Sequence, residues 1–193
     1  MLCWIKNFLS DRRAKVRYGV AHSKLNKFEE GVPQGCVLSP TLFTVFINDI
    51  SYNMPAEVKC SLFADDLAFC TRHKNLGEAE QSMQDAMDSV VQWSLENKME
   101  ISVEKTEQTL FTTDNKQKKT ALDIRLNGVT VKFNGAPKCL GVKFDQGLTF
   151  REHIDDLCKT KNRIKWSTKF VAGTCKKFCL ILVFMFFYIM CFS

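Results

Sequence analysis

Residues 62–69, LFADDLAF, place two adjacent carboxylates in the middle of an otherwise apolar run. The apolar segments on either side, 58–63 and 67–70, have the length and composition of short strands, which predicts a tight hairpin with the acidic pair at its turn. Adjacent aspartates within a regular strand would point to opposite faces, whereas at a turn they can project near one another. Two charges beside a buried hairpin must be offset, either by solvation or by a bound divalent cation such as magnesium.

The composition describes a chain that can bury one sizeable core. It has 193 residues, of which 46% are hydrophobic and 25% charged, so we expect one domain with or without appendages. The net charge of +6 is compatible with a polyanionic partner but does not identify one. Basic clusters within 1–27, 116–119 and 159–169 surround an acidic stretch at 78–107. This pattern suits contact with a phosphate backbone at several points, although solvated faces explain each cluster singly.

The cysteines and the C-terminal run bear on the environment of the protein. The nine cysteines form no CxxC pair and have no histidines at zinc-ligand spacing, which predicts reduced thiols in an intracellular protein, cytoplasmic or nuclear, without a signal peptide.

Residues 178–192 are an uncharged run of 15 residues, slightly short for a membrane span of about 20. A tail anchor, a buried terminal helix and a read-through tail are the three interpretations.

The remaining pattern predicts an α+β fold in which an antiparallel sheet carries the acidic turn and helices pack on one face. Helix signals include Ser39-Pro40, expected as N-cap and first helical residue, and the capping-box spacing at 149–152. Asn127-Gly128 is the strongest hairpin signal. The expected helices are 1–9, one starting at Ser39-Pro40, 76–97 and one running from 149 through Ile164, and the further expected strands are 14–20, 25–29, 108–112, 122–126, 129–133 and 138–144.

Residues 31–40, GVPQGCVLSP, form a second informative stretch. Two glycines four residues apart around a proline favour a tight loop where the backbone can approach a ligand closely. Turn formation alone is the commoner reason for such glycines.

GVPQGCVLSP at 31–40, followed by FADD at 63–66, resembles the reverse transcriptases of non-LTR retrotransposons of the jockey-like kind. Segments 4–12, 104–107, 139–145 and 148–154 are similar to further motifs in the family's order, so the resemblance covers about residues 1–174. It implies a partial polymerase right hand: fingers and palm over 1–147, with boxes at 31–40, 62–70, 104–107 and 138–145; the start of the thumb over 148–174; and a hydrophobic tail at 175–193 outside the resemblance.

The resemblance implies RNA-directed DNA polymerisation by two-metal nucleotidyl transfer. Asp65 would coordinate metal, with Asp66 in a supporting part, and Lys105 would act as a general acid near the leaving pyrophosphate. The cofactor would be Mg²⁺, two ions in an intact parent enzyme, and the partners an RNA template, a DNA primer and deoxynucleotides.

The resemblance also implies binding residues for template, nucleotide and primer. They fall in the glycine loop, in the segment that would grip the primer end, and in the thumb helix that would track the nucleic-acid backbone. In that order they are Gly31, Pro33, Gln34 and Gly35; Cys139, Leu140 and Gly141; and Lys159, Lys161 and Arg163.

Two departures from the family pattern bear on activity. Cys36 stands where the family usually has serine, a near-isosteric change to a weaker hydrogen-bonding group. Another catalytic aspartate of the family lies upstream of segment 4–12, and no residue here fills that place. We therefore expect a fragment with at most a partial metal site, inactive by itself. The alternatives are a non-catalytic nucleic-acid-binding remnant and a tail-anchored membrane protein; we expect no membrane association and favour a read-through tail.

Overall fold

The computed structural model describes residues 1–112, 114, 116–118, 120–160 and 179–188. The chain divides into two compact units. The first comprises Met1–Asp49 and the end of the chain from Tyr188, and the second is Ile50–Phe187. In the described part of the chain, no helix has the length and apolar character needed to cross a membrane.

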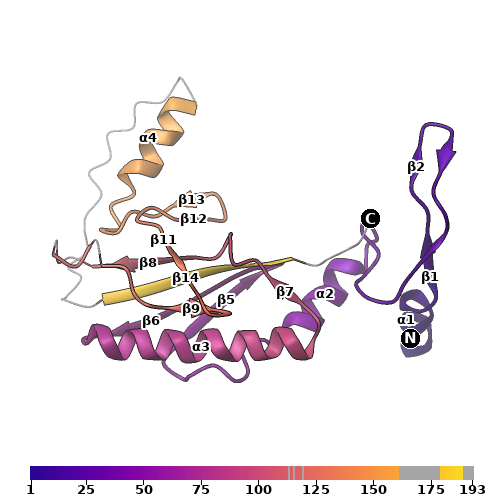
Figure 1. Ribbon diagram of the computed structural model, residues 1–193. Helices are drawn as coiled ribbons and strands as arrows, with labels where there is room; N and C mark the ends of the chain where they lie inside the picture. The colour runs from indigo at the N-terminus through magenta and orange to yellow at the C-terminus, as the bar shows by residue number, and fades with distance from the viewer. Residues whose placement is uncertain (113, 115, 119, 161–178, 189–193) are drawn as a thin grey trace. The chain divides into compact units, whose positions relative to one another are not determined.

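The second unit is built on a six-stranded sheet (Figure 1). Its strand order is β11 (Lys132–Phe133), β8 (Glu107–Phe111), β14 (Cys179–Tyr188), β6 (Asp66–His73) and β5 (Lys59–Phe63), and β7 (Glu100–Ile101) also pairs with β14. The predicted α+β class is confirmed. The sheet that carries the acidic turn is antiparallel as predicted in the pairs β5–β6, β6–β14 and β14–β8, and it departs from that prediction at one edge, where β11 runs parallel to β8.

The interpretation of the C-terminal run as a helix is wrong for Cys179–Tyr188, which forms the longest strand of the sheet. This strand, β14, is antiparallel to β6 over residues 179–186 and to β8 over residues 180–184. Backbone groups on the facing edges of β6 and β8 need hydrogen-bond partners, and a strand between them supplies partners to both. The run is rich in β-branched and aromatic residues, which favour a strand in such a place.

Helix α3 (Leu76–Glu96) packs against β6 and covers one face of the sheet (Figure 1). Asn75 caps it, because its side chain accepts a hydrogen bond of 3.0 Å from the Gly77 N–H. The helix expected at 76–97 is confirmed, and its buried residues include Ala79, Met83, Ala86, Met87, Val90 and Trp93. Leu67 and Phe69 of β6 are equally buried, so these two elements form the centre of the core.

A polar network fixes the face of β6 that meets the helix. The Ser82 hydroxyl of α3 lies 3.0 Å from Glu57 Oε1 and 3.4 Å from His73 Nε2. His73 therefore lies on the side of β6 that faces α3, together with Leu67 and Phe69 at alternate positions. The even-numbered residues of β6, Asp66 among them, lie on the opposite face.

The Asn127-Gly128 hairpin forms as predicted. Strands β9 (Arg125–Leu126) and β10 (Val129–Thr130) flank a turn in which both residues have positive φ, 51° and 80°. The hairpin docks on α3 through a reciprocal pair of hydrogen bonds, in which Gln84 Nε2 donates to the Arg125 carbonyl and the Arg125 N–H donates to Gln84 Oε1.

The expected strand at 138–144 is wrong, since these residues form a tight hairpin. Strands β12 (Lys138–Cys139) and β13 (Val142–Lys143) flank Leu140 and Gly141, whose φ values of 46° and 86° reverse the chain. Helix α4 (Arg151–Thr160) follows, and the continuation expected through Ile164 lies outside the described residues. The hairpin lies on the face of the sheet away from α3 (Figure 1).

The first unit has little core of its own. It contains α1 (Leu2–Leu9), β1 (Arg12–Ala14), β2 (Arg17–Tyr18), β3 (Ala21–His22), β4 (Asn26–Phe28) and α2 (Ser39–Ile47). The return strand expected at 25–29 is confirmed as β4, which pairs with β1. The continuous strand expected at 14–20 is wrong, because Gly19 at φ 60° turns the chain into a second short hairpin.

We predict that Phe69→Ala lowers the free energy of unfolding by about 3–5 kcal/mol, because it removes a fully buried ring and leaves a cavity. Urea unfolding followed by the helical circular dichroism signal measures this change. The matched control is Phe63→Ala on the adjacent strand, where the residue is 63% exposed and the cost should stay within about 0.5 kcal/mol. Equal costs at the two positions would contradict the described packing.

Candidate active site

The β5–β6 hairpin presents the two aspartates at its tip. Phe63 pairs with Asp66, so Ala64 and Asp65 are the two turn residues. Asp65 is exposed, and Asp66, as the first residue of β6, is half-buried. Ala64 has a φ of 52°, which residues other than glycine rarely adopt, so the turn is strained.

The electrostatics of the pair follow from this placement. Burial, and then the neighbouring Asp65 carboxylate, raise the pKa of Asp66. Burial, and then the Asp66 carboxylate, also raise the pKa of the Cys139 thiol. The structure thus brings the predicted primer-grip residue Cys139 into electrostatic range of the acidic pair.

Aromatic packing holds the β12–β13 hairpin above this face. Phe111 of β8 meets Phe144 edge-on at a centroid distance of 6.4 Å, and Phe144 lies 5.6 Å from Phe150 at the start of α4. Leu140 and Gly141, predicted to contact the primer, are exposed at the tip of the hairpin. This predicted group therefore lies on the same face of the sheet as Asp66.

Lys105 lies on the turn that leads into β8 and is exposed. Its N–H donates to Ser102 Oγ at 3.4 Å, and the Thr106 hydroxyl donates to the Ser102 carbonyl at 2.7 Å, which closes the turn. Strand β14 runs between β8 and β6, so it separates the strand that follows Lys105 from the strand that begins at Asp66.

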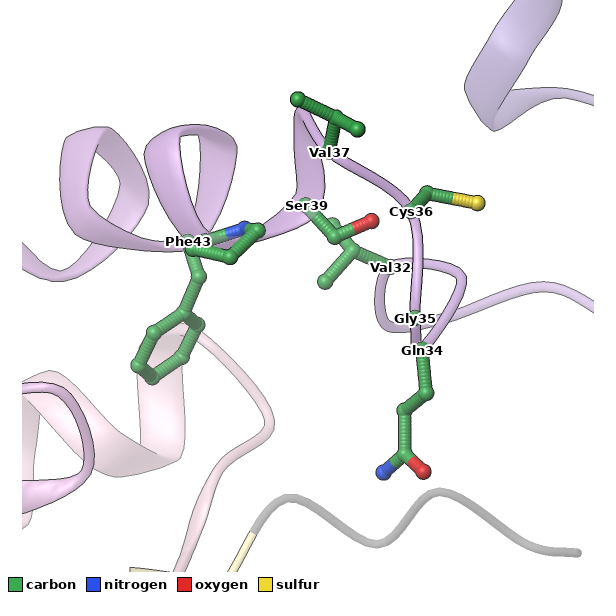
Figure 2. Close-up of a pocket in the computed structure, with 8 residues that line it drawn as sticks. Val32, Gln34, Gly35, Cys36, Val37, Ser39 and Phe43 are labelled. Atoms are coloured by element: carbon green, nitrogen blue, oxygen red, sulfur yellow. The ribbon is translucent and has the colours of Figure 1, made fainter.

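The glycine loop belongs to the first unit and forms an open pocket of about 450 Å³ (Figure 2). Gly31 and Gly35 have φ values of 76° and 79°. Open space surrounds Gly35, so its backbone conformation rather than crowding requires glycine. The Gln34 side chain extends from the loop in Figure 2 and is exposed. The lining residues are Val32, Gln34, Gly35, Cys36, Val37, Ser39, Pro40 and Phe43.

The expectation that Ser39 caps α2 is wrong. The helix begins at Ser39 itself and Leu38 occupies the cap position, so Pro40 is the second helical residue. The Ser39 hydroxyl donates instead to the Pro33 carbonyl. This bond ties the end of the loop to its beginning and leaves the loop shape dependent on a buried serine.

Asp145 has a structural part that the sequence prediction did not assign to it. It accepts hydrogen bonds from the N–H groups of Gly147, Thr149 and Phe150, and it replaces the capping box expected at 149–152. Burial alone would raise the pKa of Asp145, but the bonds from Thr149, Phe150 and Gly147 lower it on balance. An aspartate two residues before glycine is a turn signal that could have predicted this arrangement.

Lys143 ties the β12–β13 hairpin to α4 by ion pairs with Glu152 at 3.0 Å and Asp156 at 3.5 Å. The predicted backbone-contact residue Lys159 is exposed on α4. Lys161 and Arg163 lie outside the described residues.

A family profile described as "Reverse transcriptase (RNA-dependent DNA polymerase)" matches residues 1–166. The chain belongs to this reverse transcriptase family. It is 31% identical over 159 residues to the RNA-directed DNA polymerase from mobile element jockey of Drosophila melanogaster, covering 79% of this chain and 17% of that protein. The corresponding jockey protein of Drosophila funebris is also 31% identical, with the same coverage of 79% and 17%.

A third relative is the probable RNA-directed DNA polymerase from transposon X-element of Drosophila melanogaster. It is 29% identical over 164 residues, which cover 83% of this chain and 18% of that protein. The chain thus spans less than a fifth of the length of these relatives. No solved structure matches the chain. The predicted resemblance to a jockey-like, non-LTR retrotransposon polymerase is confirmed.

The donor set at the hairpin tip is limited to two carboxylates. Reverse transcriptases use divalent metal ions, and oxygen ligands such as Asp65 and Asp66 suit them. Within the described ranges, no group of three or more histidine, cysteine or acidic residues is arranged to hold a metal ion. The exposed Asp65 and the half-buried Asp66 therefore fit part of a ligand set for such an ion.

We predict that Asp66→Asn raises the melting temperature at pH 7. The pKa of Asp66 is raised in the fold, so its protonated form favours folding at low pH and this contribution is lost as pH rises through the folded-state pKa. The gain should therefore vanish below about pH 4, near the ordinary pKa of aspartate. Thermal unfolding between pH 3 and pH 8 measures it.

The control for this series is Asp155→Asn, at an exposed position on α4, which should shift the melting temperature little at any pH. A lower melting temperature for Asp66→Asn at pH 7 would contradict the description of the pair.

Proposed function

We propose that this chain forms the palm and the start of the thumb of a retrotransposon RNA-directed DNA polymerase, with an RNA template, a DNA primer and deoxynucleotides as partners. The observation that carries this proposal is the two-residue turn that presents Asp65 and Asp66 together at the end of the β5–β6 hairpin. The family match over residues 1–166 supports it.

Asp65 and Asp66 are the residues that would hold Mg²⁺. Burial and the repulsion from Asp65 raise the pKa of Asp66, and a bound cation would relieve that repulsion. Bound magnesium supplies charge stabilisation for the attacking and leaving oxygens of the phosphoryl transfer.

The other residues bind and orient the substrates. The exposed tip of the β12–β13 hairpin, Leu140 and Gly141, holds the primer end on the face that carries Asp66. Gly31, Pro33, Gln34 and Gly35 shape the surface for template and nucleotide, and Lys105 donates a proton to the leaving pyrophosphate. Lys159 on α4, with Lys161 and Arg163, contacts the nucleic-acid backbone.

A chimera tests the proposed function. Residues 1–166 of this chain replace the matching segment of the jockey polymerase, and RNA-templated DNA synthesis is measured with magnesium. We expect synthesis from the chimera and its loss on Asp65→Asn, while Asp155→Asn retains it. A folded chimera whose synthesis is unaffected by Asp65→Asn would overturn the assignment.

By itself, the 193-residue chain should not extend a primer on an RNA template, because its described residues offer only two adjacent carboxylates to the metals. Incorporation of labelled deoxynucleotides with magnesium measures this. Incorporation that disappears in Asp65→Asn would show that the chain holds a complete site, contrary to this prediction.

The β1–β4 arm supports the nucleic-acid part of the proposal. Arg13 and Lys27 on these strands pair with Asp11 at 3.1 Å and Glu29 at 3.2 Å, whereas Lys15, Arg17 and Lys24 are exposed beyond them. We infer that these cations contact phosphate groups.

We predict that the double variant Lys15→Ala, Lys24→Ala binds single-stranded RNA with a weaker salt dependence, because it loses two phosphate contacts. The slope of the logarithm of the association constant against the logarithm of the salt concentration should become shallower by about 1.4, or about 0.7 for each lost contact. Fluorescence anisotropy between 50 and 200 mM salt, about the range over which such contacts weaken, measures the slope. The control is Lys74→Ala with Lys132→Ala, exposed lysines of the second unit, which should leave it unchanged. An unchanged slope in the first variant would contradict the contact.

A further inference from the structure

The β2–β3 hairpin ends the β1–β4 arm in a tight turn (Figure 1). Tyr18 pairs with Ala21, so Gly19 and Val20 are the two turn residues. Gly19 has a φ of 60°, and a type II′ turn has glycine with positive φ at this first central position. The turn therefore places Tyr18 directly at the tip of the arm.

Hydrogen bonds hold the tip in this shape. Below the turn, the Ser23 N–H donates to the Val16 carbonyl at 2.9 Å, and the Val16 N–H donates to Ser23 Oγ at 2.8 Å. Arg17 Nε donates to the Gly19 carbonyl at 3.0 Å, and the arginine remains exposed. The Arg17 guanidinium is thus held beside the turn, next to the residue at the tip.

The side chains at the tip are apolar and open to solvent. Tyr18 is 89% exposed and the turn residue Val20 is 98% exposed. A tyrosine ring has a large apolar area and gains free energy when a partner covers it. Single exposed apolar residues are common on protein surfaces, so the exposure alone does not identify the partner.

The charge around Tyr18 identifies the class of partner. Residues 12–28 contain six lysines and arginines and no aspartate or glutamate. Lys15, Arg17 and Lys24 are all exposed on the arm. Cations of one sign, grouped in this way, attract a polyanion. A polyanion that also offers flat ring faces to a tyrosine is a nucleic-acid strand with accessible bases.

We propose that Tyr18 stacks on a base of a single-stranded nucleic acid while the cations beside it hold the phosphates. The bases of a duplex are already stacked on one another, so the ring selects an unpaired strand. Every base has a ring face, so this contact does not select a sequence. The inference rests on the proposed function, which gives the chain a nucleic-acid partner, and it adds the kind of strand and the residue that recognises it.

Binding of the full chain to a fluorescein-labelled oligouridine, measured by fluorescence anisotropy, tests the stack. Loss of one base–aromatic stack weakens binding by about 5- to 150-fold, so Tyr18→Ala should raise the Kd at least about fivefold. Tyr18→Phe should change the Kd little, because it keeps the ring. The matched control is Tyr52→Ala in the second unit, where the tyrosine is 87% exposed and its loss should leave the Kd unchanged. Far-UV circular dichroism establishes that each variant is folded.

A second probe separates stacking from charge. The same sugar–phosphate chain built from stable abasic residues keeps the phosphates and offers no base, so Tyr18→Ala should bind it as tightly as the unaltered chain does. The salt dependence of oligouridine binding should also be the same for both proteins, because the variant retains its cations. An equal loss of affinity for the two probes would show that Tyr18 supports the hairpin rather than a base, and would overturn the proposal.

Other partners for the tip predict different results. If Tyr18→Ala weakens binding to double-stranded RNA as much as to oligouridine, the preference for a single strand is wrong. If it releases the chain from phosphatidylserine vesicles and leaves oligouridine binding unchanged, the tip binds a membrane surface and the proposal is overturned.

The outcomes also separate this inference from the proposed function. Oligouridine binding that Tyr18→Ala leaves unchanged overturns the stack alone. An unaltered chain that does not bind oligouridine overturns both the stack and the phosphate contacts of the arm. The chimera with the jockey polymerase decides the role of Asp65 independently of either result.

Discussion

The packing of α3 against β6 sets the geometry of everything else in the second unit. Because Leu67 and Phe69 are buried against the helix, strand alternation forces Asp66 to the opposite face, where the β12–β13 hairpin lies. A shift of one residue in the pairing of β5 and β6 would bury the carboxylate and expose the core. The hydrophobic core therefore orients a site that contributes nothing to the core's own stability.

The parts of the fold that were predictable from sequence are those with local signals. The β5–β6 hairpin, the long helix with its apolar stripe and the Asn127-Gly128 turn each depend on residues close in sequence. Strand β14 was not predictable, because its conformation depends on pairing with strands about 70 and 110 residues earlier in the chain. The β12–β13 hairpin was missed because its turn uses Leu140 at positive φ, which the residue type does not suggest.

The candidate site likewise combines features that local sequence predicts with features that depend on contacts between distant residues. The acidic pair and the glycine loop were identifiable because each is a short contiguous motif in the sequence. The electrostatic proximity of Cys139 to Asp66, and the anchoring of α4 by Asp145 and Lys143, come from contacts that no spacing rule encodes. Side-chain bonds of this kind decide where the exposed hairpin tip lies relative to the aspartates.

The left-handed turn residue Ala64 has a consequence for how the carboxylates can vary. Glycine would adopt its φ of 52° without strain, but it would also widen the range of turn conformations open to Asp65. Alanine at position 64 costs the hairpin some stability, but it restricts the positions that the neighbouring Asp65 carboxylate can occupy. The residue types tolerated at position 64 should then be limited by how much positional variation of the Asp65 carboxylate the chemistry allows, rather than by the stability of the hairpin.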